Sequence, residues 1–263
     1  MKLRKNAACW LISLLVCAAP AWAAAHLHLA GDSTMATKER KTPNPEYGWG
    51  EALPRYFSER LTVVNHATNG RSTKSFIDEG RWQKLVDALQ PGDWVIVQFG
   101  HNDQKPDAAR HTEPRGTYAA NLRRMIADVR AKGATPILAT SVARRKWSAD
   151  GAHLVDTHGE YLAAARTVAQ EEKVPLLELN TLTTALEEAH GVEGSKRLHL
   201  WIAPNVYARQ PKGWRDDTHY SAYGADRVAA LAVQEIIRLG LPLADFLAGD
   251  APAGKEADSK AER

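Results

Sequence analysis

Short apolar runs alternate with longer segments of helical periodicity along almost the whole chain, and this alternation limits the possible folds more than any other feature. The apolar runs predict strands at residues 27–30, 61–65, 93–99, 135–140 and 174–179. Strands that alternate with helices form parallel βαβ units with right-handed crossovers. We therefore predict an α/β fold, a three-layer α/β/α sandwich with about five parallel strands.

The segments between these strands predict the helical layers. Their periodicity predicts helices at residues 51–60, 82–89, 118–132, 157–172, 181–190 and 222–239. Pro54 implies that the first of these helices begins late, because proline is tolerated only in the first turn. Gly133 follows the third helix, where a left-handed cap is expected.

The N-terminus predicts a secretory signal peptide at residues 1–23. Basic residues come first, an apolar run covers residues 7–19, and Ala21-Trp22-Ala23 matches the Ala-x-Ala pattern of a signal-peptidase cleavage site. The apolar run is too short to span a bilayer comfortably. Lipid attachment at Cys17 is disfavoured, because the preceding Val16 is large. We expect cleavage after Ala23 and a periplasmic or secreted mature protein. The mature protein is expected to be monomeric and not bound to a membrane.

Cleavage of the signal peptide changes the net charge and the number of cysteines. The full chain has 34 basic and 31 acidic residues, and the predicted signal peptide carries three of the basic ones. The mature chain is therefore almost neutral, which removes electrostatic support for a nucleic-acid partner. Both cysteines, Cys9 and Cys17, lie in the predicted signal peptide, so disulfides and cysteine-based metal sites are not expected.

One domain is expected at residues 24–248, since no repeat or interdomain linker interrupts the chain. About 240 residues suffice for one sizeable core. From residue 249 the chain is charged and almost free of apolar side chains, so residues 249–263 are predicted to be a disordered tail.

Polar residues follow three of the predicted strands, and a fourth polar block precedes the last helix. The blocks are Gly-Asp-Ser-Thr-Met at residues 31–35, Asn-His-Ala-Thr-Asn-Gly-Arg-Ser at 65–72, Gly-His-Asn-Asp at 100–103 and Asp-Asp-Thr-His-Tyr-Ser at 216–221. Ligands bind beyond the carboxyl ends of the strands in open α/β sheets, so these blocks are the candidate site.

The four blocks, in this order, resemble the SGNH (GDSL-type) hydrolases, whose signature residues are Ser, Gly, Asn and His. Within that family, the segments Gly-Asp-Ser-Thr-Met-Ala, Gly-Trp-Gly at residues 48–50 and Gln-Phe-Gly-His-Asn-Asp at residues 98–103 resemble the rhamnogalacturonan acetylesterase branch. The resemblance implies a flavodoxin-like SGNH hydrolase fold and a serine esterase.

The resemblance assigns Ser33 as nucleophile, His219 as base and Asp216 as the carboxylate that orients the imidazole. A serine hydroxyl needs such a base to be nucleophilic at neutral pH. Asp217 competes for the orienting role, and the family pattern Asp-x-x-His favours Asp216. Ser33 could instead cap a helix, since serine and aspartate are favoured at such positions.

The resemblance also implies an oxyanion hole made of the backbone N–H groups of Ser33 and Gly70 and the amide of Asn102. Glycine allows the backbone to approach a ligand closely. An alternative interpretation places Asn102 and Asp103 in a surface turn. No metal or organic cofactor is needed for this chemistry, and the remaining histidines show no ligand-like grouping.

Aromatic and basic residues in a long irregular stretch before His219 suit stacking on sugars and pairing with uronates. We predict substrate contacts for Trp49, Trp214 and Arg215, although a solvated loop with packed tryptophans explains the stretch equally well. The predicted function is an exported serine esterase that removes O-acetyl groups from plant cell-wall polysaccharide, with rhamnogalacturonan or another pectin favoured by the resemblance. The alternatives are a lipase or thioesterase of the same superfamily and a non-catalytic polysaccharide-binding protein.

Overall fold

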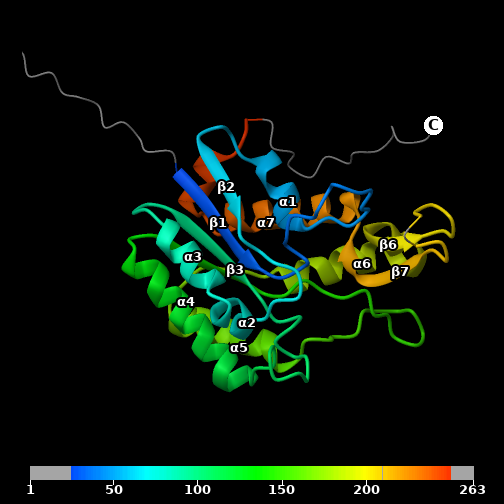
Figure 1. The fold of residues 1–263 in the computed structure, drawn as a ribbon, viewed down its shortest axis with the longest axis horizontal. Coiled ribbons are helices and arrows are strands. Elements are labelled where there is room, and N and C mark those ends of the chain that lie inside the picture. Colours follow the sequence, from blue (N-terminus) through cyan, green and yellow to red (C-terminus); the bar gives the residue numbers. More distant parts are fainter. Residues whose placement is uncertain (1–24, 209, 250–263) are drawn as a thin grey trace, which may run out of the picture.

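A five-stranded parallel sheet forms the centre of the computed structural model, which describes residues 25–208 and 210–249. The strands lie in the order β2-β1-β3-β4-β5, and Figure 1 shows β2, β1 and β3 running side by side. Their bounds are β1 (Ala25–Gly31), β2 (Leu61–Asn65), β3 (Trp94–Gln98), β4 (Thr135–Ala139) and β5 (Leu176–Leu177). Every neighbouring pair is parallel, as the alternating pattern predicts.

Burial of the strands follows their place in the sheet. Leu27 and Leu29 of β1 and Ile96 of β3 are fully buried, as expected for central strands covered on both faces. Strand β5 is shorter than predicted and pairs through only two residues. Pro175, directly before it, has no backbone N–H, so the strand cannot donate to the ladder at that position.

Helices cover both faces of the sheet and confirm the three-layer prediction. One core cluster joins the sheet to α1 (Trp49–Ala52), the 3-10 helices η1 (Leu53–Tyr56) and η4 (Pro242–Phe246), the start of α6 (Leu179–Gly194), and α7 (Ala222–Arg238). The other cluster joins it to α2 (Thr73–Asp78), α3 (Arg81–Ala88), α4 (Ala119–Ala131) and α5 (Glu160–Glu171). The two sets lie on opposite sides of the strands in Figure 1.

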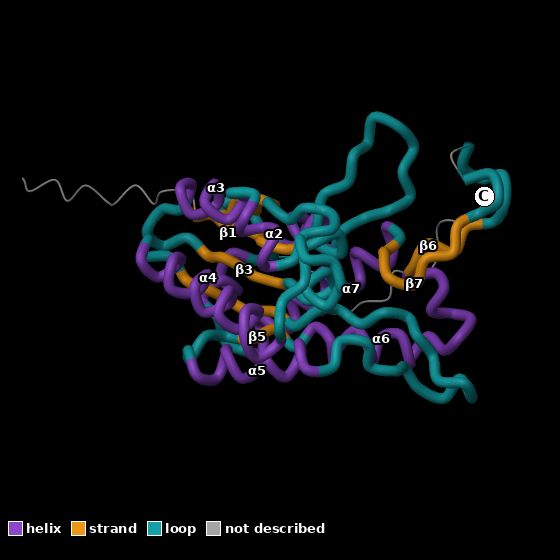
Figure 2. Tube along the Cα trace, turned by 60° about the horizontal axis from the view of Figure 1, so that its bottom comes forward, coloured by secondary structure: helices purple, strands orange, loops and turns teal. Residues whose placement is uncertain are grey.

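A small antiparallel hairpin extends the fold beyond the main sheet, and the sequence patterns do not predict it. Strands β6 (His199–Ile202) and β7 (Trp214–Tyr220) pair in a two-stranded sheet, which lies to one side in both Figure 1 and Figure 2. Backbone pairing between Tyr47 and Tyr220 ties its end to the segment before α1. The stretch before His219 is therefore partly a strand, and the prediction that it is irregular throughout is wrong.

The predicted helix at residues 51–60 is also wrong in extent. The α-helical part ends at Ala52, and a 3-10 turn follows from Leu53 to Tyr56, with Pro54 at its start. Further short elements are a π-helical turn (Pro114–Tyr118) and a 3-10 turn (Ser195–Leu198). Gly133 has a φ of +70°, in agreement with its predicted cap.

Two sequence predictions lie outside the described residues: the signal peptide at residues 1–23 and all but the first residue of the tail at residues 249–263. Within residues 25–208 and 210–249, no helix has the length and apolar character needed to cross a bilayer.

Candidate active site

A tight turn at the end of β1 presents Ser33 at the carboxyl edge of the sheet. The backbone carbonyl of Asp32 accepts bonds from the N–H groups of Met35 and Ala36, at 3.2 and 3.0 Å. The buried carboxylate of Asp32 accepts two more from Thr34, from its N–H at 2.9 Å and its hydroxyl at 2.8 Å. No helix begins at Ser33, so the helix-capping alternative is not supported.

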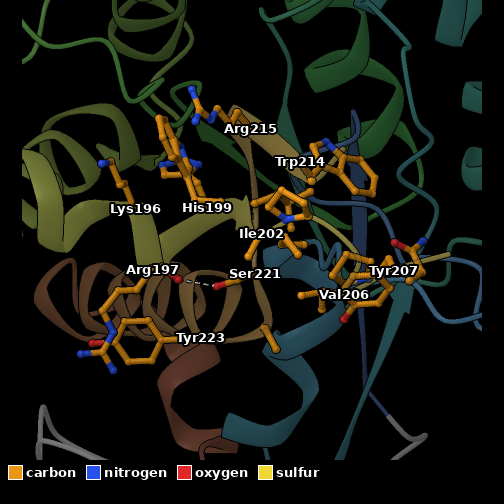
Figure 3. A pocket seen from close by; sticks show the side chains of 18 of the residues that line it. Lys196, Arg197, His199, Ile202, Val206, Tyr207, Trp214, Arg215, Ser221 and Tyr223 are labelled. Atoms are coloured by element: carbon orange, nitrogen blue, oxygen red, sulfur yellow. Dashed lines mark hydrogen bonds between the residues drawn. The ribbon is translucent and has the colours of Figure 1, made fainter. Parts of the chain in front are cut away.

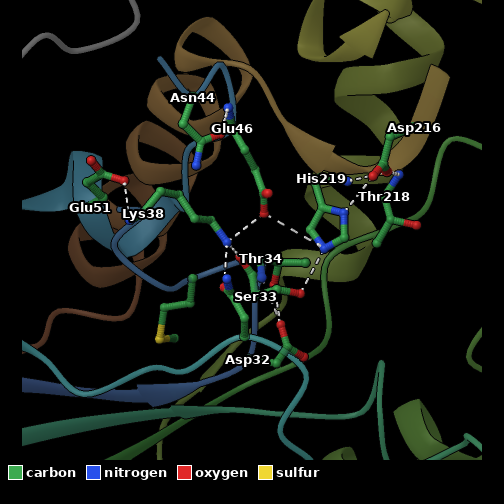
Figure 4. Close-up of polar contacts among 12 residues, drawn as sticks. Asp32, Ser33, Thr34, Lys38, Asn44, Glu46, Glu51, Asp216, Thr218 and His219 are labelled. Carbon is green, nitrogen blue, oxygen red and sulfur yellow. Dashed lines mark hydrogen bonds and ion pairs between the residues drawn. The ribbon is translucent and has the colours of Figure 1, made fainter. Parts of the chain in front are cut away.

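Strand β7 brings His219 and Asp216 to this turn. His219 Nε2 lies 2.9 Å from Ser33 Oγ, and His219 Nδ1 lies 2.7 Å from Asp216 Oδ2. Figure 4 shows the imidazole between the hydroxyl and the carboxylate. Asp216 Oδ1 also accepts hydrogen bonds from the backbone N–H groups of Thr218 and His219, and these bonds fix the orientation of the carboxylate. The structure thus joins residues 186 positions apart in one chain of hydrogen bonds.

The electrostatics of this pair suit a base that works near neutral pH. Burial alone lowers the pKa of His219, but the bond and the charge of Asp216 outweigh it, so the pKa lies above its ordinary value. Burial alone raises the pKa of Asp216, but its bonds to His219 and Thr218 lower it to about 2. Asp216 is therefore ionised wherever His219 titrates, and it favours the tautomer that carries the proton on Nδ1.

Asp217, the competing candidate, faces a different set of partners. Its Oδ1 accepts bonds from Arg145 Nη1 at 2.9 Å and from the indole N–H of Trp201 at 2.7 Å. Neighbouring side chains alternate in direction along a strand, which separates the two adjacent carboxylates. The geometry therefore agrees with the choice of Asp216 over Asp217.

The two other predicted oxyanion donors, Gly70 and Asn102, line the same pocket as Ser33. Gly70 has a φ of +76°, a left-handed conformation that favours glycine. The Asn102 amide donates to the carbonyl of Arg71 at 3.1 Å, and its Oδ1 accepts a long bond from Arg110 at 3.5 Å. These contacts orient the amide and leave its second N–H without a partner in the described structure.

Asp103, next to Asn102, has a structural role rather than a place in a surface turn. It is fully buried and accepts bonds from the N–H and hydroxyl of Thr73 and from the hydroxyl of Thr112. Burial raises its pKa to about 7 despite these bonds. Asp103 therefore ties the loop that carries Asn102 to the start of α2, directly after the Gly70 loop.

Two charged residues at the site, Lys38 and Glu46, were missed by the sequence analysis. The buried Lys38 ammonium bonds to the Ser33 carbonyl, to Asn69 Oδ1 at 2.8 Å and to Glu46 Oε1 at 2.6 Å. Glu46 Oε1 in turn lies 3.9 Å from His219 Nε2. Figure 4 shows Glu46 between the Lys38 ammonium and the His219 ring. Neither residue belongs to a motif or periodic pattern, so only the folded chain reveals them.

The predicted substrate contact of Trp49 is wrong. Its side chain is fully buried, and its indole N–H donates to Gln98 Oε1 at 2.7 Å. Gln98 then donates to the Thr34 hydroxyl at 3.3 Å. Trp49 therefore has no exposed surface on which a sugar could stack. Through Gln98, it supports the turn that carries Ser33.

Trp214 and Arg215 line a cavity of about 1200 Å³ beside the hairpin, and none of the residues lining it also lines the Ser33 pocket. Figure 3 shows Trp214 and Arg215 among its side chains. Arg215 also lies over the ring of Trp201, 5.5 Å from its centre. A substrate contact for these two residues stays a prediction, and it would require a ligand longer than one sugar ester at Ser33.

The Ser33 pocket has a volume of about 410 Å³ and a polar lining. Every residue lining it is polar or glycine: Ser33, Glu46, Asn69, Gly70, His101, Asn102, Lys105, Arg110, Arg144, Thr218 and His219. No group of three or more histidine, cysteine or acidic side chains in the described part of the chain is arranged to hold a metal ion.

Comparison with curated proteins identifies close relatives of this chain. It is 43% identical over 219 residues to the rhamnogalacturonan acetylesterase RhgT of Bacillus subtilis, covering 83% of this chain and 92% of that protein. It is 28% identical to a rhamnogalacturonan acetylesterase of Emericella nidulans, covering 92% and 96% of the two chains.

Solved structures share the fold. The protein YxiM of Bacillus subtilis superposes with a TM-score of 0.71 at 30% identity; the match covers 84% of this chain but only 58% of that longer one. The acetylxylan esterase Axe2 of Geobacillus stearothermophilus superposes with a TM-score of 0.58 at 18% identity, covering 81% and 94%. This second similarity concerns the fold alone.

The sequence model of the GDSL-like lipase/acylhydrolase family matches residues 29–227, a span that includes all four polar blocks. With the relatives and the hydrogen-bonded Ser33, His219 and Asp216, this match shows that the chain belongs to the GDSL-like lipase/acylhydrolase family and is a carboxylic ester hydrolase.

Proposed function

We propose that the protein is an exported serine esterase that removes O-acetyl groups from rhamnogalacturonan through an acetyl-enzyme intermediate. The observation that carries the chemistry is the continuous chain from Ser33 Oγ through the His219 ring to Asp216, with separations of 2.9 and 2.7 Å. The choice of polymer rests on the 43% identity to an enzyme named for rhamnogalacturonan.

Acylation begins when Ser33 Oγ attacks the acetyl carbonyl while His219 Nε2 takes the hydroxyl proton. Asp216 stabilises the resulting imidazolium without taking the proton itself. The N–H groups of Ser33 and Gly70 and the free N–H of Asn102 would bind the oxyanion as it develops. The imidazolium then protonates the departing sugar oxygen, and the acetyl group stays on Ser33.

Deacylation repeats these steps with water as the nucleophile. His219 takes a proton from the water that attacks the acetyl-enzyme, and then returns a proton to Ser33 Oγ as acetate leaves. The same three residues and the same donors therefore serve both halves of the reaction.

The lining of the Ser33 pocket favours an acetyl ester over a lipid. A long acyl chain needs apolar surface to leave water, whereas every residue that lines this pocket is polar or glycine. We expect nitrophenyl acetate to be hydrolysed far faster than nitrophenyl octanoate. A preference for octanoate would favour the lipase alternative.

The direct test compares acetate release from acetylated rhamnogalacturonan and from acetylxylan, by the wild type, Ser33→Ala and the control Ser148→Ala. Wild type and control should release acetate, preferentially from rhamnogalacturonan, and Ser33→Ala should lose almost all activity. A phosphonate inhibitor should label Ser33 covalently, and equal acetate release by Ser33→Ala would disprove the mechanism.

Export is supported by the basic, apolar and small-residue segments of residues 1–23. Expression of the full chain should yield mature protein that begins at Ala24 outside the cytoplasm, as read by N-terminal sequencing. Full-length protein retained in the cytoplasm would contradict this part of the proposal.

A further inference from the structure

The Ser33 pocket is lined by cationic side chains that are not all paired with a carboxylate. Three cationic side chains line it, Lys105, Arg110 and Arg144, against the single carboxylate of Glu46. Glu46 pairs with Lys38 at 2.6 Å, and Arg110 pairs with Asp107 at 2.7 Å. Neither Lys38 nor Asp107 lines the pocket. No ion pair in the described structure involves the other two cations, so Lys105 and Arg144 stand at the pocket without a paired carboxylate.

Arg144 is held in place by oxygen atoms that carry no formal charge. Its Nη1 donates to the carbonyl and the hydroxyl of Thr157, at 3.3 and 3.0 Å. Its Nη2 donates to the carbonyl of His101 at 3.3 Å. A guanidinium has five N–H groups, so the N–H of Nε and one N–H of Nη2 have no acceptor among the described residues.

The surroundings of Arg144 make this lack of a counter-charge costly. Its side chain is half-buried, and burial lowers its pKa from the ordinary value, an effect that the charge of the buried Asp32 offsets only in part and without an ion pair. The rings of His101 and His158, which pack edge to face with centres 4.5 Å apart, lie in the same region and offer no negative charge. A buried guanidinium is stabilised when a carboxylate supplies both charge and paired acceptors.

We propose that Arg144, assisted by Lys105, forms a carboxylate subsite beside Ser33, which binds the uronate of an acidic oligosaccharide next to its acetylated sugar. The free N–H of Nε and Nη2 would donate to the carboxylate, a geometry that arginine supplies and lysine does not. Lys105 is exposed at the rim and adds a second positive charge without fixing the orientation. This inference rests on the proposed esterase function and adds selectivity for anionic substrates.

The test measures inhibition rather than polymer turnover. Digalacturonate and the neutral disaccharide galactobiose are added as competitors while the enzyme hydrolyses nitrophenyl acetate, a neutral ester. Digalacturonate should inhibit the wild type and galactobiose should inhibit much less. In Arg144→Gln the inhibition constant for digalacturonate should rise by roughly 10- to 100-fold, the range expected for a lost charge-assisted pair.

Two further variants test the geometry and the specificity of the effect. Arg144→Lys keeps the charge but loses the paired donors, so its inhibition constant should lie between those of the wild type and Arg144→Gln. Arg166→Gln is the matched control, because Arg166 is an arginine that pairs with Glu178 and does not line the Ser33 pocket. Its inhibition constant should equal that of the wild type.

An inhibition constant does not depend on how much of a variant is folded, so a partly misfolded sample does not obscure the result. An unchanged constant in Arg144→Gln, or equal inhibition by the two disaccharides, would overturn the subsite. If the wild type releases no acetate from rhamnogalacturonan but inhibition by digalacturonate still depends on Arg144, the polymer assignment fails and the subsite stands.

Discussion

Two histidine–aspartate pairs lie beside the same pocket, and their environments give them opposite properties. His219 Nδ1 lies 2.7 Å from Asp216, and its side chain keeps 28% of its surface exposed. His101 Nδ1 lies 3.5 Å from Asp32, and both side chains are fully buried. The first imidazole has a raised pKa, whereas burial lowers the pKa of the second.

The comparison shows that the surroundings of an imidazole set the direction of its pKa shift. A close carboxylate stabilises the protonated form of His219, which supports its proposed role as the base that takes the Ser33 proton. Asp32 Oδ1 accepts both bonds from Thr34, and Oδ2, the oxygen nearer to His101, lies 3.5 Å from Nδ1, too far for a strong hydrogen bond to that ring. His101 is therefore a neutral side chain that lines the pocket, and Asp32 holds the turn that carries Ser33.

The largest expected effect separates Asp216 from its neighbour. Asp216→Asn should lower kcat by about 10⁴-fold, because the amide no longer holds the required tautomer of His219. Asp217→Asn is the matched control, and it should retain most of the activity while lowering stability through the loss of a partner for the buried Arg145. Steady-state kinetics and urea unfolding measure the two effects. A similar loss of kcat in both variants would remove the distinction between the two carboxylates.

The second prediction concerns the buried histidines, and it is tested by the pH dependence of the unfolding free energy. Burial lowers the pKa of His158, which packs on His101, to about 2. In the unfolded chain His158 is protonated near pH 6.5, whereas in the folded chain it stays neutral. The free energy of unfolding therefore decreases as the pH falls below 6.5. The expected loss from His158 is on the order of 2 kcal/mol between pH 7.5 and 5.

Urea unfolding at the two pH values measures this loss. His158→Gln should reduce the difference in unfolding free energy between pH 7.5 and 5, whereas His153→Gln, at an exposed position, should not. An unchanged difference in His158→Gln would show that His158 accepts a proton while folded.

The smallest expected effect concerns the pH profile of the active pair. Burial lowers the pKa of His219, and among the groups that offset this, Asp216 contributes more than Glu46. Glu46→Gln removes one negative charge 3.9 Å from Nε2 and also frees the positive charge of Lys38, and both changes lower the pKa of His219. The acid limb of kcat/KM should therefore move to lower pH, with a few-fold gain in activity on that limb. A shift to higher pH would show that Glu46 does not act on His219 through its charge.

The sequence predicted the parts of the fold that repeat a simple pattern. Central strands such as β3 are continuous apolar runs, and long helices such as α4 and α7 have clear periodicity and ends. Strand β7 could not be recognised, because it reads Trp-Arg-Asp-Asp-Thr-His-Tyr and is mostly half-buried, without an apolar alternation. Helix α2 has only six residues, too few for a period to show.

The site divides in the same way. Ser33, Gly70, Asn102, Asp216 and His219 stand in short motifs that can be read along the chain. Lys38 and Glu46 act through contacts with Ser33 and His219 that depend on a loop conformation, so no local pattern marks them. Trp49 misled the prediction, because an aromatic residue among polar neighbours has the same sequence context whether it faces a sugar or the core.

The position of β7 has a consequence for how the enzyme loses activity. Ser33, the proposed nucleophile, directly follows a strand of the main sheet, whereas His219 and Asp216 belong to a two-stranded hairpin, which the Tyr47–Tyr220 backbone pairing holds at its end. The working distance of 2.9 Å is thus set by the docking of two separate sheets. Mild heat or denaturant that displaces the smaller sheet would abolish activity while the large sheet is still folded. Inactivation should therefore precede global unfolding.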